Sequence, residues 1–254
     1  MIPTQILRVL STIRTYDVRA LLMGGQACVL YGAAEYSRDL DLAVLATPEA
    51  LPALRGALDA LNATVIDVPS FDPRYLERGL AVHFSIPYES ASPLRVDVMS
   101  RLRGVDAFPH LWERRTTIAL PTGHGDAELL VDVMALEDLV AAKKTQRDKD
   151  WPMLRRLVDA SYAAARDDAV TDAQVAFWLA ELRSPEFLLE LVAQYPEVAA
   201  RSPRPAVQAA LNDDDIDAAL AAEQAQVMAV DRAYWAPLRR ELEALRHEAR
   251  IARG

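Results

Sequence analysis

Short apolar runs of strand length recur through the first half of the chain, with helical patterns between them. The runs that predict strands are "VRALLMGG", "DLDLAVL", "ATVIDV", "LAVHFSI", "LRVDVMS", "TTIAL" and "ELLVDVMAL". Proline, glycine, serine and aspartate separate these runs, as in "TPEA" and "VPSFDPR". This alternation predicts layers of sheet and helix, typical of an α/β or α+β structure.

The pattern changes at Leu136, beyond which alanine, leucine, glutamate and arginine dominate and strand signals end. We therefore expect two regions, residues 1–135 around a sheet and residues 136–254 entirely helical. Prolines that follow serine or aspartate, as in "DKDWP" and "RSPEF", are typical of helix starts. They predict four or five helices in the second region, the last running from Asp214 or Ile216 towards Arg250.

Two glycines and two aspartates interrupt the apolar pattern within "LLMGGQACVLYGAAEYSRDLDLAVL". Gly24 and Gly25 end one predicted strand and can begin a helix, whose free backbone N–H groups a phosphate can approach. Asp39 and Asp41 open the next strand and point to one face about 7 Å apart, because side chains alternate along a strand. Their mutual repulsion favours a divalent metal ion or a basic partner. The alternative is a purely structural role, in which the glycines form an ordinary turn and the aspartates lie on an exposed edge strand.

The order of these features, "GG", thirteen residues and then "DLDL", resembles the signature of the DNA polymerase beta-like nucleotidyltransferase superfamily. The resemblance implies that the glycine pair opens a helix that holds a nucleotide's triphosphate and that the two aspartates bind magnesium. Ser37 and Arg38 fit the polar or basic residues often found just before such aspartates. The implied fold is α+β, a mixed sheet flanked by helices and followed by a helical region that closes over the cleft.

A third acidic residue on a later strand is implied by the same resemblance, and Asp97 is the preferred candidate. In "LRVDVMS" it shares its face with Arg95, and "LAVHFSI" is the expected antiparallel partner of that strand. Asp132 is the alternative, whereas Asp67 precedes a proline and is more typical of a turn. A purely structural Asp97, paired with Arg95 or with a neighbouring strand, would show the same pattern.

A helix starting at Leu136 would place Leu136, Val140, Lys143 and Arg147 on one face, so that an apolar stripe turns basic. Such a helix suggests that its far end lines a charged cleft. "KKTQRDKD" also resembles an element that follows the sheet in small nucleotidyltransferase-like proteins, including toxins of abortive-infection type systems. The resemblance implies contacts with the triphosphate for Arg147 and for either Lys143 or Lys144.

The remaining charges of this segment have simpler interpretations. Lys144 and Asp148 can form a solvent-exposed pair one helical turn apart. Asp150 can cap the next helix. His83, in a predicted strand, is most simply a structural residue, since the four histidines lack ligand spacing.

The overall charge and the cysteine count limit the possible partners. The net charge of −9 argues against broad nucleic-acid binding, and a phosphate ligand would need metal ions or clustered basic residues. The single cysteine, Cys28, excludes an internal disulfide and fits a reducing cytoplasm. With no window of apolar residues long enough for a membrane span and no leader pattern, we expect a soluble cytoplasmic protein.

These features lead to one principal hypothesis and two alternatives. The principal one is a nucleotidyltransferase that uses Mg²⁺ or Mn²⁺, held by Asp39, Asp41 and Asp97, to move an NMP from an NTP to an acceptor hydroxyl with release of pyrophosphate. The acceptor, a small molecule, a protein or an RNA end, stays open. One alternative is a toxin of a two-gene system, with an antitoxin partner, that modifies tRNA or protein. The other is a catalytically inactive module that binds nucleotide or a partner.

Overall fold

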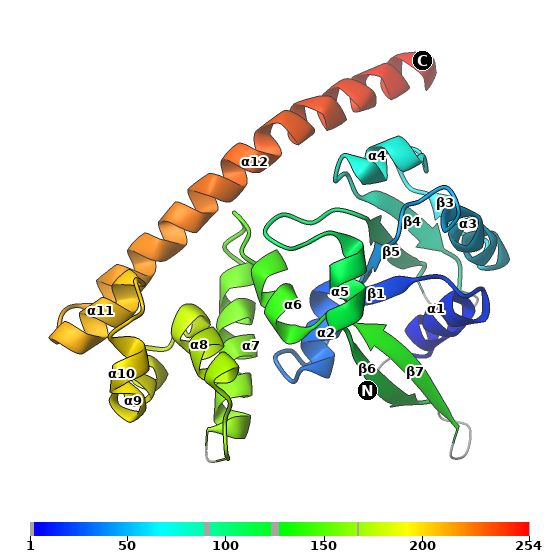
Figure 1. Cartoon of the computed structure of the whole chain (residues 1–254). Helices are drawn as coiled ribbons and strands as arrows, with labels where there is room; N and C mark the ends of the chain where they lie inside the picture. Colours follow the sequence, from blue (N-terminus) through cyan, green and yellow to red (C-terminus); the bar gives the residue numbers. More distant parts are fainter. Residues whose placement is uncertain (1–2, 89–91, 123–126, 167, 254) are drawn as a thin grey trace.

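A seven-stranded mixed sheet organises the first half of the chain (Figure 1). The computed structural model describes residues 3–88, 92–122, 127–166 and 168–253. The strands are β1 (Ala20–Met23), β2 (Leu40–Val44), β3 (Thr64–Val65), β4 (Val82–Ile86), β5 (Leu94–Met99), β6 (Thr116–Pro121) and β7 (Glu128–Val133). Each strand begins within one of the seven apolar runs, and β6 extends one residue beyond its run, so the predicted strands are confirmed.

The strand order β3-β4-β5-β2-β1-β7-β6 places β2 and β1 at the centre of the sheet. β2 runs parallel to β5, and β1 runs parallel to β7, whereas the other neighbours are antiparallel. The expected antiparallel pairing of β4 with β5 is confirmed. Five helices accompany the strands: α1 (Thr4–Thr15), α2 (Gly24–Leu30), α3 (Leu51–Ala60), α4 (Pro73–Glu77) and α5 (Phe108–Arg114).

All described regular structure after β7 is helical, which confirms the expected α+β fold. The helices are α6 (Leu136–Ala142), α7 (Asp150–Ala165), α8 (Asp172–Glu181), α9 (Pro185–Gln194), α10 (Pro196–Ala199), α11 (Pro205–Asn212) and α12 (Ile216–Arg253). Seven helices exceed the expected four or five, in part because Pro196, which has no N–H, separates α10 from α9. The last helix starts at Ile216, one of the two expected starts, and ends at Arg253.

The helix expected to run from Leu136 through Arg147 is shorter than predicted, because α6 ends at Ala142. The turn that follows is held by side chains instead of helical hydrogen bonds: Thr145 Oγ1 donates to Asp150 Oδ2 at 2.5 Å, and Trp151 Nε1 donates to the Thr145 carbonyl at 3.0 Å. Such contacts offer the backbone an alternative to the helix. The single basic face predicted for this segment is therefore wrong.

Two smaller expectations for the same segment also need correction. Lys144 Nζ donates to Glu181 of α8 at 2.5 Å, so its partner lies in another helix and not one turn away. Asp150 is the first residue of α7, and Lys149 occupies the cap position. Asp150 is buried and pairs with Lys143 and Arg147, as described below, so its carboxylate is not available to cap the helix.

The long helix α12 connects the two halves of the chain. It rises from α11 and passes over the sheet half towards α4 (Figure 1, orange to red). Near its start Glu223 accepts from Arg204 Nε at 3.1 Å, and its far half carries Glu241, 2.7 Å from Arg78 Nη1 beside α4. Among the described helices, none, α12 included, is both long and apolar enough to cross a membrane.

Candidate functional site

A row of side chains crosses the middle of the sheet and contains two carboxylates. The strand registers pair Met23 with Asp41, Asp41 with Asp97, and Asp97 with His83. Residues paired in register project from the same face of a sheet, so Asp41 and Asp97 are neighbours in this row. The sequence predicted both strands, and the parallel pairing of β2 with β5 sets the carboxylates level with each other.

Asp41 carries a poorly compensated charge. Its hydrogen bond from the Gly25 N–H is long, 3.4 Å to Oδ2. Burial and the neighbouring charge of Asp97 raise the pKa of Asp41 above its ordinary value, against the opposing influence of Lys143. No described cation forms an ion pair with it.

Asp97, by contrast, is held by two basic side chains. Arg95 spans the carboxylate, with Nε 2.8 Å from Oδ1 and Nη2 3.0 Å from Oδ2, and His83 Nδ1 lies 2.8 Å from Oδ1. Burial alone would raise the pKa of Asp97, but the hydrogen bonds from His83 and Arg95 outweigh it and hold the pKa below its ordinary value. The structural pairing considered for Asp97 is therefore present, and it involves a histidine that the sequence placed only as a structural residue.

A pocket of about 530 Å³ lies over the carboxylate row. Its walls include eight of the nine residues predicted for the site: Gly24, Gly25, Ser37, Asp39, Asp41, Asp97, Lys143 and Arg147. The ninth, Arg38, is exposed and is not among the lining residues. The alternative carboxylates lie elsewhere: Asp132 lines a different pocket, and Asp67 lies 3.6 Å from Arg246 of α12.

The glycine pair allows α2 to begin directly against the carboxylates. Gly24 has φ +66°, and a Cβ at this position would lie 1.9 Å from Asp41 Oδ2. A Cβ on Gly25 would lie 2.3 Å from Ser37 Oγ. A side chain at either position would therefore have to displace a neighbouring side chain, that of Asp41 at Gly24 and that of Ser37 at Gly25.

Basic side chains at the end of α6 and in the turn that follows it form another wall of this pocket. Their common partner is Asp150, which is buried: Arg147 Nε lies 2.7 Å from its Oδ2, and Lys143 Nζ lies 3.9 Å from its Oδ1. Lys143 is nearly buried, with a side chain 12% exposed, whereas Arg147 is 59% exposed. Of the two lysines left open by the sequence, Lys143 lines the pocket and Lys144 does not.

A buried ion pair that the sequence did not reveal attaches α12 to this wall. Asp231 is 1% exposed, receives a charge-assisted hydrogen bond from Arg103 and accepts from the Gln146 N–H at 2.7 Å. Arg103 also donates to the Lys144 carbonyl. The one sequence signal was an aspartate placed one turn from both Met228 and Trp235, on the apolar side of its helix.

The oxygen donors of the carboxylate row fit a divalent cation in part. Carboxylate oxygens are the ligands that Mg²⁺ prefers, and Asp41 offers both of its oxygens with little competition. Among the described residues, however, no group of three or more histidine, cysteine, aspartate or glutamate side chains forms a metal-holding cluster. The adjacent pair Asp41 and Asp97 fits a cation if Arg95 turns away from Asp97. A metal role for Asp39 stays a prediction.

No family model and no curated protein matches the chain. Among solved structures, it is similar to an antigenic nucleotidyltransferase-like protein from Paracoccidioides brasiliensis, with 13% identity and a TM-score of 0.42, over 78% of this chain and 90% of that one. It is also similar to ANT(2″)-Ia in complex with adenylyl-2″-tobramycin, with 13% identity and a TM-score of 0.34, over 76% of this chain and 96% of that one. Because both TM-scores are low, the functional assignment rests on the geometry of the site.

Proposed function

We propose that the chain is a metal-dependent nucleotidyltransferase, which moves an NMP from an NTP to an acceptor hydroxyl and releases pyrophosphate. The observation that carries this proposal is the level pair of carboxylates, Asp41 and Asp97, in one pocket with the basic side chains of Lys143 and Arg147. Carboxylates that hold a cation and basic groups that bind phosphate are the two requirements of phosphoryl and nucleotidyl transfer.

In this proposal Asp41 and Asp97 hold Mg²⁺ or Mn²⁺, with Asp39 as a third acidic group in the pocket. The bound cation supplies charge neutralisation at the phosphates and lowers the pKa of the acceptor hydroxyl. Arg95 occupies both oxygens of Asp97, so cation binding requires it to turn away, which frees its guanidinium for a phosphate. Asp97 is then the carboxylate assigned to accept the hydroxyl proton.

The other predicted residues that line the pocket are assigned to the nucleotide. Lys143 and Arg147 are assigned to the triphosphate, for which their shared partner Asp150 fixes their positions. The glycine pair and Ser37 leave room for close approach of the phosphates to the start of α2. Trp235 of α12 lines the same pocket and offers an aromatic surface to a base or to an acceptor ring.

Transfer of a radiolabel tests this proposal directly. The protein is incubated with each α-labelled NTP, Mg²⁺ or Mn²⁺ and a cell lysate, and the labelled product is identified as small molecule, protein or RNA. We expect transfer that is lost with Asp41→Asn and with Asp97→Asn. The matched control is Asp132→Asn, which changes a sheet carboxylate that lines the other pocket and should leave transfer intact. Equal transfer by Asp41→Asn would refute the proposal.

The ion pairs around Asp97 favour a second candidate, a module that binds nucleotide without catalysis. Arg95 and His83 together occupy Asp97 in a way that also suits a purely structural carboxylate. That candidate predicts nucleotide binding without any transfer of label, and binding that survives Asp97→Asn. The labelling experiment and a binding titration on the same variants therefore separate the two.

A further inference from the structure

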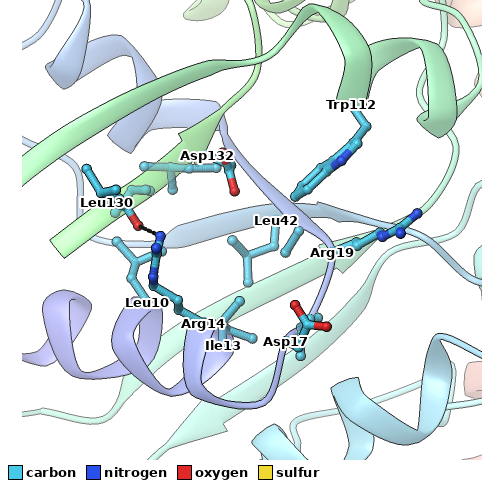
Figure 2. A pocket seen from close by; sticks show the side chains of 13 residues that line it. Leu10, Ile13, Arg14, Asp17, Arg19, Leu42, Trp112, Leu130 and Asp132 are labelled. Atoms are coloured by element: carbon cyan, nitrogen blue, oxygen red, sulfur yellow. Dashed lines mark hydrogen bonds between the residues drawn. The ribbon is translucent and has the colours of Figure 1, made fainter.

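A second hollow, of about 520 Å³, opens where the end of α1 and the start of β1 meet β7 and α5 (Figure 2). Its size lies within the range of about 300–1,000 Å³ that is usual for small-molecule sites. None of its lining residues lines the carboxylate pocket. Leu42 lines this hollow and its chain neighbour Asp41 lines the other, as expected for side chains that alternate along a strand.

The floor of this hollow is aliphatic. Leu10 and Ile13 of α1 contribute to it together with Leu22 and Leu42 of the central strands, and each of these four is less than a tenth exposed. These side chains lie almost fully buried beneath the hollow, so the groups around its mouth, with Trp112, make up most of the surface that a ligand can reach.

The mouth of the hollow carries two cations without acidic partners. Arg14 and Arg19 form no ion pair with any described residue, although the protein as a whole is acidic. Arg14 is held by a hydrogen bond from Nη1 to the Leu130 carbonyl at 2.9 Å, which leaves its other donors available. Asp132 is already neutralised, because Arg115 Nε lies 2.8 Å from its Oδ1. With Asp17 as the remaining exposed carboxylate, the mouth keeps a net positive charge.

An aromatic side chain fixed by its neighbours forms one wall. The Arg115 guanidinium lies 4.2 Å from the centroid of the Trp112 ring, and its Nη1 donates to the Trp112 carbonyl at 2.7 Å. Phe108 stacks on the same indole at 5.8 Å between centroids. In Figure 2 Trp112 and Arg19 lie across the hollow from Arg14, with Leu42 between them. The aromatic wall and Arg14 at the mouth are therefore held in place without a ligand.

We propose that this hollow is a ligand site, separate from the carboxylate pocket, for a small molecule with an aromatic or apolar body and one anionic group. The aromatic body packs against Trp112, and the anion binds the Arg14 guanidinium, while Arg19 on the other side of the mouth adds to its positive charge. The proposal does not depend on nucleotidyl transfer.

The test uses 8-anilinonaphthalene-1-sulfonate, an aromatic anion that fluoresces in apolar surroundings. We expect one bound molecule per chain, and an affinity that falls by about tenfold or more with Arg14→Ala/Arg19→Ala, because a charge-assisted contact and the positive charge of the mouth are lost. Leu130→Trp, at a strand position that is 44% exposed and lines the hollow, should fill it and abolish binding. The neutral analogue N-phenyl-1-naphthylamine should bind more weakly and should not respond to the arginine changes.

The matched control is Arg8→Ala, which removes an exposed arginine of the same helix outside the hollow. It should leave the affinity unchanged, and circular dichroism confirms that each variant is folded. Absence of binding to the wild-type protein would overturn the proposal. So would an affinity that neither the double arginine variant nor Leu130→Trp reduces, because the dye would then be bound elsewhere.

Discussion

The two walls of the carboxylate pocket are built in different ways. The sheet wall, with Gly24, Asp41 and Asp97, is set by strand register and by the start of α2. The helical wall, with Lys143 and Arg147, is set by ion pairs to buried carboxylates of α7 and α12. The first wall collects negative charge and the second collects positive charge, so a ligand that needs both can bind between them.

The two walls should respond differently to substitution. Backbone hydrogen bonds hold the sheet wall, so single side chains there alter the local charge more than the fold. The helical wall depends on a few buried charges, so that loss of one carboxylate leaves a cation without a partner. Substitutions in the two walls should therefore differ in their effects on stability and on binding.

The largest effect on stability is expected for Asp231→Ala. This change leaves Arg103, 19% exposed, without its partner and removes the acceptor of the Gln146 N–H. Loss of one member of a buried ion pair costs about 3–5 kcal/mol of the free energy of unfolding, measurable by urea denaturation. The control Glu243→Ala removes an exposed acid from the same helix and should change little. An equal effect of both variants would contradict the role given to Asp231.

Gly24→Ala should have the next largest effect, on the sheet wall. The new Cβ would meet Asp41 Oδ2 in a left-handed backbone conformation, for which we expect a cost of about 1–3 kcal/mol. Gly32→Ala is the matched control, because Gly32 has φ +74° but nothing within 4 Å of the built Cβ. The difference between the two free energies of unfolding isolates the contact with Asp41. If Gly24→Ala costs no more than Gly32→Ala, that contact is unimportant.

Asp97→Asn and Asp41→Asn should change stability in opposite directions when a chelator is present. Asp97→Asn weakens the bonds from Arg95 and His83 and should cost about 1–3 kcal/mol at neutral pH. Asp41→Asn removes a buried charge with little compensation and should raise the melting temperature. Differential scanning calorimetry in EDTA compares them, and a lower melting temperature for Asp41→Asn would contradict this description of the row.

The pH dependence follows from the same two pKa shifts. The pKa of Asp97 is lowered, so its stabilisation is present above the unfolded value of 3.8 and is lost as the pH falls through the folded pKa. The pKa of Asp41 is raised, so its contribution to stability declines as the pH rises from 3.8 through the folded pKa. Asp41→Asn should remove the decline in the free energy of unfolding with rising pH. Asp97→Asn should remove the loss of stability at acid pH.

The smallest effect on stability is expected for Arg147→Ala in the helical wall. Its side chain is 59% exposed, and its buried partner Asp150 keeps its contacts with Lys143 and Thr145, so we expect a loss of about 0–1 kcal/mol. The melting temperature should therefore hardly change, whereas the affinity for NTP, measured by calorimetry, should fall. A large loss of stability would show that Arg147 supports the wall instead of the ligand.

The sequence predicted the sheet wall well because its signals are local. Strand alternation fixed the face of Asp41 and Asp97, and the glycine pair marked the start of α2. The partners of Asp97 were harder to predict, because the pairing of His83 with Asp97 depends on a register that a strand pattern alone does not fix. Arg95 was recognised on the correct face, but not as a ligand of both carboxylate oxygens.

The helical wall was predicted less well because its placement depends on contacts between distant segments. Periodicity continued the first helix through Arg147, yet the hydrogen bonds of Thr145 and Gln146 to Asp150 and Asp231 end it at Ala142. Asp231 lies 85 residues beyond Gln146, so no local pattern could pair them. Single aspartates within apolar helix faces are the signal to seek in such chains.

Calorimetric titration shows directly whether Asp41 and Asp97 hold a divalent cation for a nucleotide. Each of the four NTPs is titrated into the wild-type protein and into Asp41→Asn, once with Mg²⁺ and once with EDTA. We expect Mg²⁺-dependent binding of at least one NTP, weakened by about tenfold or more in Asp41→Asn. Binding of equal affinity in both proteins, or binding that does not depend on Mg²⁺, would contradict it.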